Sequence, residues 1–308
     1  MNSEKLSPRQ LWVAVTTGGL SAGAAAAGRT DWRWLLLAAV LGTAMGWLLL
    51  WRVGHRPLHP VLKGLYCAWA VVLMADVMKR TADRIQQTAG NGENVSWLLV
   101  LLVIPLAWMG WGKAAAFFRA VEIFWLAALV TVAAIFLLGV PRVDWQWVLE
   151  PAGGWRNSLL AGVLTMSTGL FVLPILYKLE PDLNGDRRGL AWLGALGLIS
   201  AALAAVTAGL LSPAVAAELD GPFFAAAGLL GDSARLEGLV SGLWLLPDLT
   251  LAGLLAHSWG IQRWPALAVA VALGLALFGV TDVLPEAVLP LGCLTLAILT
   301  AVFPKGRG

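Results

Sequence analysis

The amino-acid sequence predicts an all-α polytopic membrane protein, and three observations support this prediction. Of the 308 residues, 59% are hydrophobic and only 13% are charged, whereas soluble domains carry about 25% charged residues. Apolar stretches of about 20 residues, the length that crosses a bilayer as a helix, recur along the chain. The strict alternation of apolar and polar residues that is typical of transmembrane β-strands is absent. Since only helices and closed barrels satisfy their backbone in lipid, helices are expected.

Ten membrane-spanning helices are predicted, at residues 10–28, 32–52, 60–80, 96–111, 117–139, 157–178, 189–211, 235–256, 264–281 and 284–303. The stretch between the seventh and eighth spans contains Pro213, Pro222, Glu218 and Asp220. These residues disfavour a full span and favour short helices at the outer surface. The spans form a single domain over residues 1–308, with a first half at about 10–140 and a second half at about 157–303.

The distribution of Lys and Arg predicts that both termini lie in the cytoplasm, because cytoplasmic loops are enriched in these residues. With this orientation, eight of the 21 Lys and Arg fall in outer segments and the other thirteen in inner ones. The outer eight are Arg29, Arg33, Lys79, Arg80, Arg84, Arg142, Arg156 and Arg235. An even number of spans agrees with two cytoplasmic termini.

The first segment has a second interpretation. Lys5, Arg9, an apolar run and the stretch Ala24 to Ala27 resemble a secretory signal with a small-residue cleavage site. We favour a first membrane helix, because glycines interrupt the apolar run and a polytopic protein needs no cleavage.

Motifs of soluble enzymes are missing. The sequence has no CxxC, HExxH, Walker A or GxSxG motif. Its two cysteines, Cys67 and Cys293, lie in apolar runs, which indicates neither a disulfide framework nor a metal site. The net charge of +3 is ordinary for a membrane protein. We therefore expect no enzyme activity, cofactor, metal or nucleic-acid partner.

Two predicted helices have weak helix formers in their centres. The first helix contains Thr16 and, as candidate ligand-binding residues, Thr17, Gly18, Gly19 and Ser21. The sixth helix contains the candidates Thr165, Ser167, Thr168 and Gly169. Paired interruptions at matching places in two halves are typical of transporter binding sites, where unwound backbone binds the ligand. The alternative is close helix packing on small residues, which we favour for Ala24 to Ala27.

Three acidic residues lie within predicted spans and are candidates for an ion path: Asp76, Glu122 and Asp248. Such residues are costly in a membrane and usually face the bundle interior. Asp76 has an alternative role as a partner of Lys79 or Arg80, and Glu122 as a partner of Arg119. Asp248 has no basic neighbour within a turn, which makes it the strongest of the three candidates.

Several stretches resemble the B-subunit permeases of spore germinant receptors, which belong to the amino acid–polyamine–organocation transporter superfamily. They are KLSPRQLW with AGRTDWRW near the N-terminus, Gly112-Lys113 followed by FFRAVEIFW at the fifth helix, and SARLEGLVSGLW at the eighth. The resemblance runs through essentially the whole chain in the same order.

This resemblance implies two inverted five-helix repeats with broken first and sixth helices, and an amino acid site between the breaks. It implies that Cys67, Trp69, Ser241 and Trp244 face the same cavity. It further implies a spore inner-membrane protein that senses a nutrient, triggers ion release, and works with an A subunit and a C-subunit lipoprotein. Two alternatives stay open: an autonomous amino acid or amine transporter, and a membrane scaffold with a vestigial pocket.

Overall fold

The computed structural model of the protein describes residues 6–27, 30–53, 59–89, 95–151, 171–172, 188–219, 221–231, 235–257, 264–284 and 288–302. Within these ranges the chain is helical apart from turns, loops and one isolated β-bridge between Ala27 and Thr30. The predicted sixth span lies outside the described residues, except for Phe171 and Val172, which are helical and buried. Its candidates Thr165, Ser167, Thr168 and Gly169 therefore also lie outside them.

The first half of the chain forms the helices α1 (Pro8–Ala26), α2 (Trp32–Val53), α3 (Pro60–Ala89), α4 (Val95–Trp111) and α5 (Ala114–Gly139), the 3₁₀ turn η1 (Val140–Arg142) and the short α6 (Trp145–Leu149). The second half forms α8 (Arg188–Leu211), α9 (Pro213–Glu218), α10 (Pro222–Leu229), α11 (Arg235–Ala256), α12 (Pro265–Leu277), α13 (Val280–Val283) and α14 (Val288–Val302). The short helices α9 and α10 occupy the stretch in which short helices were predicted.

Five helices of the described part are long and apolar enough to cross a membrane. They contain the segments Trp32–Leu49, Pro60–Thr88, Ala114–Arg142, Gly189–Leu211 and Leu236–Ala256. Shorter apolar helices accompany them at Val95–Trp111, Pro265–Leu277 and Leu291–Thr300. The protein is thus a helical, multi-pass membrane protein, as the composition predicts.

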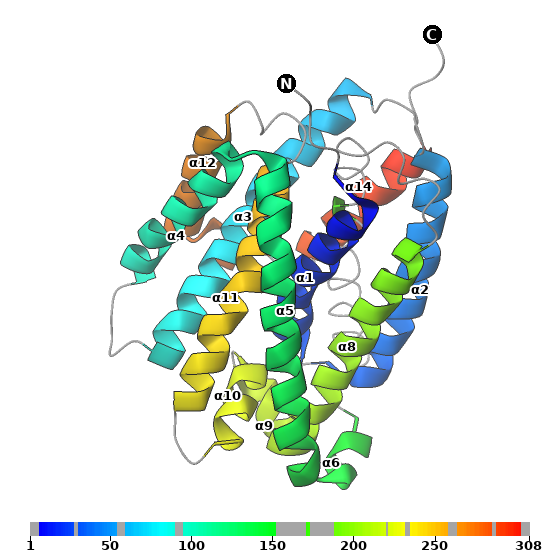
Figure 1. The fold of residues 1–308 in the computed structure, drawn as a ribbon, viewed down its shortest axis with the longest axis vertical. Coiled ribbons are helices and arrows are strands. Elements are labelled where there is room, and N and C mark those ends of the chain that lie inside the picture. Colours follow the sequence, from blue (N-terminus) through cyan, green and yellow to red (C-terminus); the bar gives the residue numbers. More distant parts are fainter. Residues whose placement is uncertain are drawn as a thin grey trace.

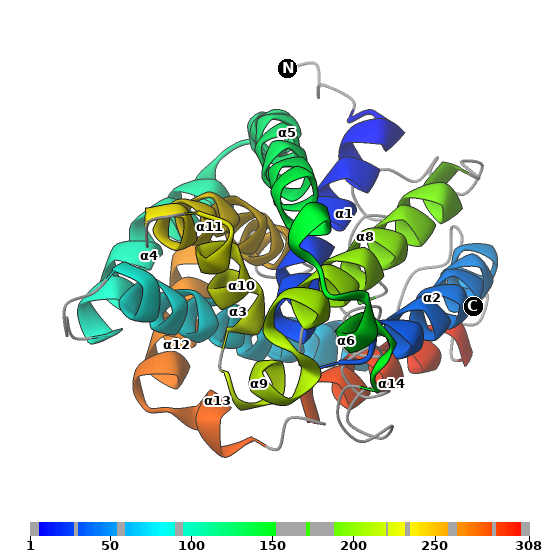
Figure 2. The same ribbon diagram turned by 90° about the horizontal axis from the view of Figure 1, so that it is seen from below.

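The helices pack as a bundle with α1 in its interior (Figures 1 and 2). Helix α1 packs against α5, α8 and α11, while α3 packs against α4, α11 and α12. Helices α2 and α14 contact each other beside α8, on the side away from α4 and α12 (Figure 2). The short helices α6, α9 and α10 gather at one end of the bundle, which is the end that we predict to be outside (Figure 1).

Side chains from distant parts of the sequence hold this end together. The indole Nε1 of Trp32 donates a hydrogen bond to the carbonyl oxygen of Val148 in α6 (3.0 Å), and Arg33 Nη2 donates one to the carbonyl oxygen of Leu149 (2.6 Å). Arg142 Nη1 donates to the carbonyl oxygen of Leu230, directly after α10 (2.8 Å). The start of α2 and the turn η1 thereby help to fix the positions of α6 and α10.

Helix α1 is continuous, so the predicted break at its centre is wrong. It starts with a capping box in which the Ser7 hydroxyl accepts from the Gln10 backbone N–H, and Pro8 follows at the first helical position. The helix then runs through Thr16, Thr17, Gly18, Gly19 and Ser21 to Ala26. The two threonine hydroxyls donate to the carbonyl oxygens of Trp12 (2.9 Å) and Val13 (2.7 Å), one turn back in the same helix.

The two glycines at the centre of α1 serve packing instead of unwinding. A Cβ on Gly18 would lie 3.2 Å from the Cα of Leu251 in α11, and a Cβ on Gly19 would overlap Leu196 Cδ2 of α8. Small residues let membrane helices approach closely, and the resulting contacts replace the hydrophobic drive that lipid cannot supply. The alternative of close helix packing therefore holds for Gly18 and Gly19.

Helix α3 is longer than predicted, because it continues from the expected end at residue 80 to Ala89. The added part carries charges at Asp83 and Arg84. These residues stay helical because they find partners: Lys79 Nζ lies 2.9 Å from Asp83 Oδ1 one turn on, and Arg84 pairs with a residue of α11. The C-terminal end of α3 thus carries charged side chains that pair within α3 and with α11.

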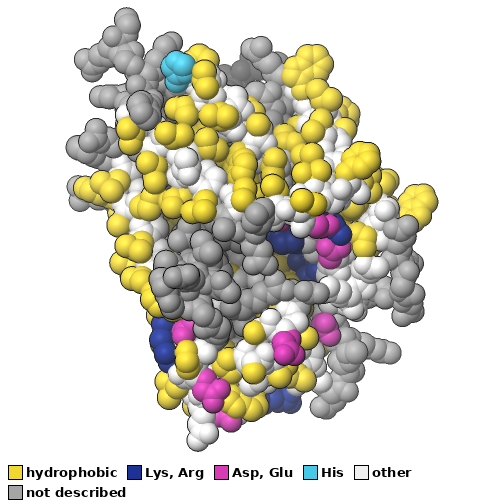
Figure 3. Space-filling view, turned by 180° about the vertical axis from the view of Figure 1, so that it is seen from behind, with side chains coloured by type: hydrophobic (Ala, Val, Ile, Leu, Met, Phe, Trp, Pro, Cys, Tyr) yellow, Lys and Arg dark blue, Asp and Glu magenta, His cyan; other side chains and the backbone are white. Residues whose placement is uncertain are grey.

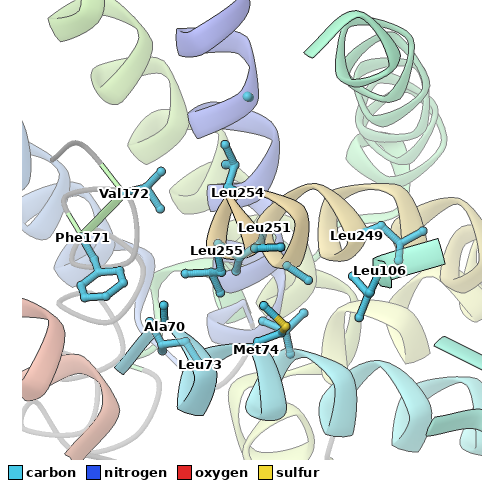
Figure 4. Packing of buried hydrophobic residues seen from close by; sticks show 14 of the residues in the cluster. Ala70, Leu73, Met74, Leu106, Phe171, Val172, Leu249, Leu251, Leu254 and Leu255 are labelled. Atoms are coloured by element: carbon cyan, nitrogen blue, oxygen red, sulfur yellow. The ribbon is translucent and has the colours of Figure 1, made fainter. Parts of the chain in front are cut away.

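The larger apolar core includes residues of α1, α3, α4, α5, α11, α12 and α14. Figure 4 shows Leu249, Leu251 and Leu255 along α11, with Leu106 of α4 beside Leu249 and Met74 of α3 below them. All five side chains are buried. This part of the bundle is filled by hydrocarbon side chains, which contrasts with the site described next.

Candidate functional site

A polar cavity of about 430 Å³ lies between α1, α3, α10 and α11. Small-molecule sites in proteins typically measure about 300–1,000 Å³, so the volume suits a small ligand. Its lining consists of Ser21, Ala24, Ala25, Val77, Arg80, Asp83, Arg84, Gln86, Gln87, Gly221, Phe224 and Asp248. Figure 3 shows basic and acidic side chains lying together in a hollow of a mostly hydrophobic face.

Helix α3 supplies most of the polar lining from a single face. Val77, Arg80, Arg84 and Gln87 recur at intervals of three and four residues, which places them in one row along the helix. On the opposite wall, Ser21 and Ala25 are one turn apart on α1. The small side chains of α1 leave open the space that the long side chains of α3 enter.

The central feature of the cavity is an ion pair between two helices. Arg84 Nη1 of α3 lies 2.6 Å from Asp248 Oδ2 of α11, and both side chains are largely buried, with relative exposures of 10% and 6%. Thr81 Oγ1 donates a second hydrogen bond to the same carboxylate oxygen (3.0 Å). Asp248 lacks a basic neighbour in sequence, but the fold provides one from α3.

Further contacts hold the Arg84 guanidinium in place. Its Nε donates to Ser241 Oγ of α11 (3.2 Å), and Thr88 Oγ1 lies 2.9 Å from the same serine oxygen. The guanidinium carbon lies 4.8 Å from the ring centroid of Phe224 in α10, a cation–π contact. Trp244 packs behind this ring, with its centroid 6.3 Å from that of Phe224. Arg84 is thus positioned by groups other than Asp248.

Two guanidinium donors in this region have no acceptor within the described part of the chain. They are Nε of Arg80 and Nη2 of Arg84, and both atoms are buried. A buried donor without a partner costs about 1–3 kcal/mol, and more when it is charged. Arg80 also pairs through Nη2 with Asp76 Oδ2 at 2.7 Å. These two arginines therefore keep hydrogen-bonding capacity that the described protein groups leave unused.

The charges that line the cavity balance. Arg80 and Arg84 contribute two positive charges, and Asp83 and Asp248 contribute two negative ones. A lining that contains groups of both signs but no net charge suits a ligand that itself carries both signs. Among the described residues, no cluster of His, Cys, Asp and Glu has the make-up of a metal site.

The predicted site residues are distributed unevenly around this cavity. Ser21 and Asp248 line it, and Ser241 touches it through its bond from Arg84. Thr17, Gly18 and Gly19 are buried in helix contacts. Trp244 is buried behind Phe224, and Trp69 packs against Gly292 of α14. Cys67, which is half-buried on α3, is likewise not part of the lining.

The other two candidate ion-path residues have different surroundings. Asp76 pairs with Arg80 one turn on, as its alternative interpretation proposed. Glu122 lies half-buried on α5 and is not part of the cavity lining. An ion-path role for either residue stays a prediction.

Sequence reasoning missed Arg80, Arg84 and Phe224, because the two arginines were assigned to an outer loop. A signal was present, since Asp76, Arg80 and Arg84 follow one another at intervals of four. Such a row continues the helical period beyond residue 80 and favours a longer helix with a charged face.

Comparison with known proteins adds no assignment: no protein-family model matches the chain, and no curated protein is detectably similar to it.

Proposed function

We propose that this multi-pass membrane protein binds a small zwitterion, such as an amino acid, in the cavity between α1, α3, α10 and α11. The observation that carries the proposal is the lining itself: a cavity of about 430 Å³ within a helical bundle that holds two arginines and two carboxylates. Charged groups inside a membrane protein are costly, and they mark ligand or ion pathways.

The chemistry of the lining supports this ligand class. A guanidinium recognises a carboxylate with two parallel N–H donors, and a carboxylate of the protein attracts an ammonium group. Both kinds of group occur here within one cavity. The apolar contribution of Ala24, Ala25, Val77 and Phe224 leaves room for a small side chain.

The site proposed here differs from the one expected from the paired interruptions. The first helix provides Ser21 through its side chain and not through unwound backbone, because α1 is continuous. The arrangement in ten helices and two inverted repeats remains part of the proposal, supported by the order of the apolar segments.

We further propose that binding serves nutrient sensing in a spore inner membrane, as a subunit of a germinant receptor with an A subunit and a C-subunit lipoprotein. The sequence stretches that resemble the B-subunit permeases support this role. Asp248 also borders a second, much smaller space of about 10 Å³, which is otherwise lined mainly by apolar side chains such as Met78, Leu102 and Leu249.

A thermal-stability screen in detergent tests the binding proposal. The twenty common amino acids are added singly, and a ligand at a hundred times its Kd is expected to add about 2.7 kcal/mol to the free energy of unfolding. Ala25→Trp fills the cavity and should abolish the effect. Val40→Trp, at an exposed position of α2, is the matched control and should retain it. If no amino acid raises the melting temperature, the binding proposal is wrong and the result favours a membrane scaffold with a vestigial pocket.

Reconstitution separates sensing from the alternative of autonomous transport. Proteoliposomes containing this chain alone should show no counterflow of the amino acid that stabilises the protein. Rapid counterflow would favour the transporter. Loss of germination in spores that carry Ala25→Trp, but not in those that carry Val40→Trp, would support the receptor.

A further inference from the structure

The Arg84–Asp248 ion pair has the make-up of an occupied carboxylate site, and this inference rests on the proposed function of the cavity. We propose that Asp248 holds the place of the ligand carboxylate in the empty protein, and that a carboxylate-bearing ligand displaces it from Arg84. The side chain of Asp248 is thereby an internal competitor for the same guanidinium.

The first support is that Arg84 does not depend on Asp248 for its position. Its Nε is bound to Ser241 Oγ at 3.2 Å, and its guanidinium stacks on the Phe224 ring at 4.8 Å. The Ser241 oxygen is itself 2.9 Å from Thr88 Oγ1. When Asp248 withdraws, these contacts leave the guanidinium in place to receive another carboxylate.

The second support is the unused capacity of the arginines. Asp248 contacts Arg84 through Nη1 and uses only its Oδ2 atom, which also accepts from Thr81. Arg84 Nη2 is buried without an acceptor among the described residues, and so is Arg80 Nε. A carboxylate has two oxygens with about four acceptor positions, so a ligand that displaces Asp248 from Nη1 has a second oxygen for Nη2 once the guanidinium turns toward the cavity.

The third support is that the Asp248 carboxylate keeps polar surroundings after it leaves Arg84. Thr81 Oγ1 of α3 donates at 3.0 Å to the same Asp248 oxygen that contacts Arg84, so this bond helps to hold Asp248 in the paired position. Asp248 lines the cavity beside Arg84, so the freed carboxylate faces the same space as the ligand. A zwitterion supplies an ammonium group for it, whereas a simple carboxylate does not.

Exchange of partners would connect ligand binding to helix packing. Arg84 belongs to α3 and Asp248 to α11, and these two helices pack against each other along the core. A ligand that replaces their ion pair removes a direct tie between them. The ligand then binds more tightly to conformations in which α3 and α11 are further apart. Such a difference in affinity between two conformations is what a ligand-driven switch requires.

The test uses Asp248→Asn, which keeps the size of the side chain and removes the competing charge. The probe is sodium acetate, with acetamide and methylammonium chloride as controls, and the readout is the melting temperature of the full-length protein in detergent. The half-saturating acetate concentration should be at least about tenfold lower for Asp248→Asn than for the natural protein. Acetamide and methylammonium should produce no such difference.

Three further variants keep the test decisive. Thr81→Val weakens the hold on Asp248 and should lower the half-saturating acetate concentration in the same direction, by about threefold. Arg84→Lys lacks the planar fork and should lose the acetate effect. Asp282→Asn removes a carboxylate that lies outside the cavity lining, 3.9 Å from Lys79 Nζ, and should leave the acetate effect unchanged.

The outcomes distinguish this inference from the proposed function. If an amino acid stabilises the natural protein but Asp248→Asn and Thr81→Val bind acetate no more tightly, the exchange of partners is wrong and the function stands. If acetate binds Asp248→Asn selectively while no amino acid binds either protein, the carboxylate site stands and the amino acid ligand falls. If Asp248→Asn fails to fold, Thr81→Val alone decides, and an unchanged or raised acetate requirement overturns the proposal.

Discussion

The interior of this protein contains two regions whose residues are both unfavourable for a membrane helix. One of them is tightly packed, and the other borders a cavity. The centre of α1 is rich in Gly, Thr and Ser, and it is fully packed: Gly18 and Gly19 bring α11 and α8 into contact. The second half of α3 is rich in charge, and it borders a cavity of about 430 Å³. Small polar residues close the bundle in one region, and long charged residues line an open space in the other.

The difference follows from the size and solvation of the side chains. A glycine or a threonine that bonds to its own helix leaves nothing that a ligand or water must satisfy. An arginine retains five N–H donors in a fixed fork, and burial makes every unused donor costly. In this bundle, long charged side chains therefore mark the candidate site, whereas the weak helix formers at the centre of α1 do not.

The largest effect is expected from breaking the buried ion pair. Arg84→Met leaves Asp248 buried without a counter-charge, and removing one partner of a buried pair costs about 3–5 kcal/mol. The double variant Arg84→Met/Asp248→Leu should recover much of this loss. Denaturant unfolding in detergent measures both.

Lys79→Met provides the control for this prediction, because its pair with Asp83 is more exposed, at 21% and 36%. Exposed pairs contribute at most about 1 kcal/mol. If Arg84→Met and Lys79→Met destabilise the protein equally, the buried pair has no special role.

A smaller effect is expected from overpacking the closed region. Gly19→Leu places a side chain where Leu196 already lies, and overpacking typically costs about 1–3 kcal/mol. Gly64→Leu on α3 is the matched control, because a Cβ there meets no other atom within 4 Å. Melting temperatures of the two variants test the prediction. A break or a ligand at Gly19 would instead show as lost binding without lost stability.

The smallest effect on stability separates two hydroxyls one turn apart on α1. Thr17→Val removes a bond to the carbonyl oxygen of Val13, which should cost less than about 1 kcal/mol and leave ligand binding unchanged. Ser21→Val changes the cavity lining and should weaken binding. Titration of both variants with the stabilising amino acid measures the difference. If Thr17→Val and Ser21→Val lose the same affinity, the ligand binds at the centre of α1 and not in the cavity.

Much of the fold could be predicted from the sequence, because hydrophobic length determines where membrane helices lie. The ends of α1, α2, α4, α8 and α11 fall within a few residues of their predicted positions. The short helices α9 and α10 could be expected from Pro213 and Pro222, but α6 could not, since its position depends on bonds from Trp32 and Arg33.

The site was harder to predict, because its parts come together only in three dimensions. Asp248 stood out as an acid without a local partner, but its partner Arg84 is 164 positions away. The glycines of α1 have the same local signature in a broken helix as in a packed one. Only the contacts with Leu196 and Leu251 decide between these two interpretations.

The central claim is that small molecules reach the region around Ala25 and not the packed centre of α1, and cysteine accessibility tests it most directly. In a variant with Cys67 and Cys293 replaced by alanine, Ala25→Cys lies in the cavity lining, and Ala22→Cys lies on the same helix at a site that is only 1% exposed. A membrane-impermeant maleimide is applied to intact cells, with and without the stabilising amino acid. We expect Ala25→Cys to be labelled and the amino acid to protect it, while Ala22→Cys stays unlabelled. An unlabelled Ala25→Cys, or equal labelling of both positions, would contradict the account.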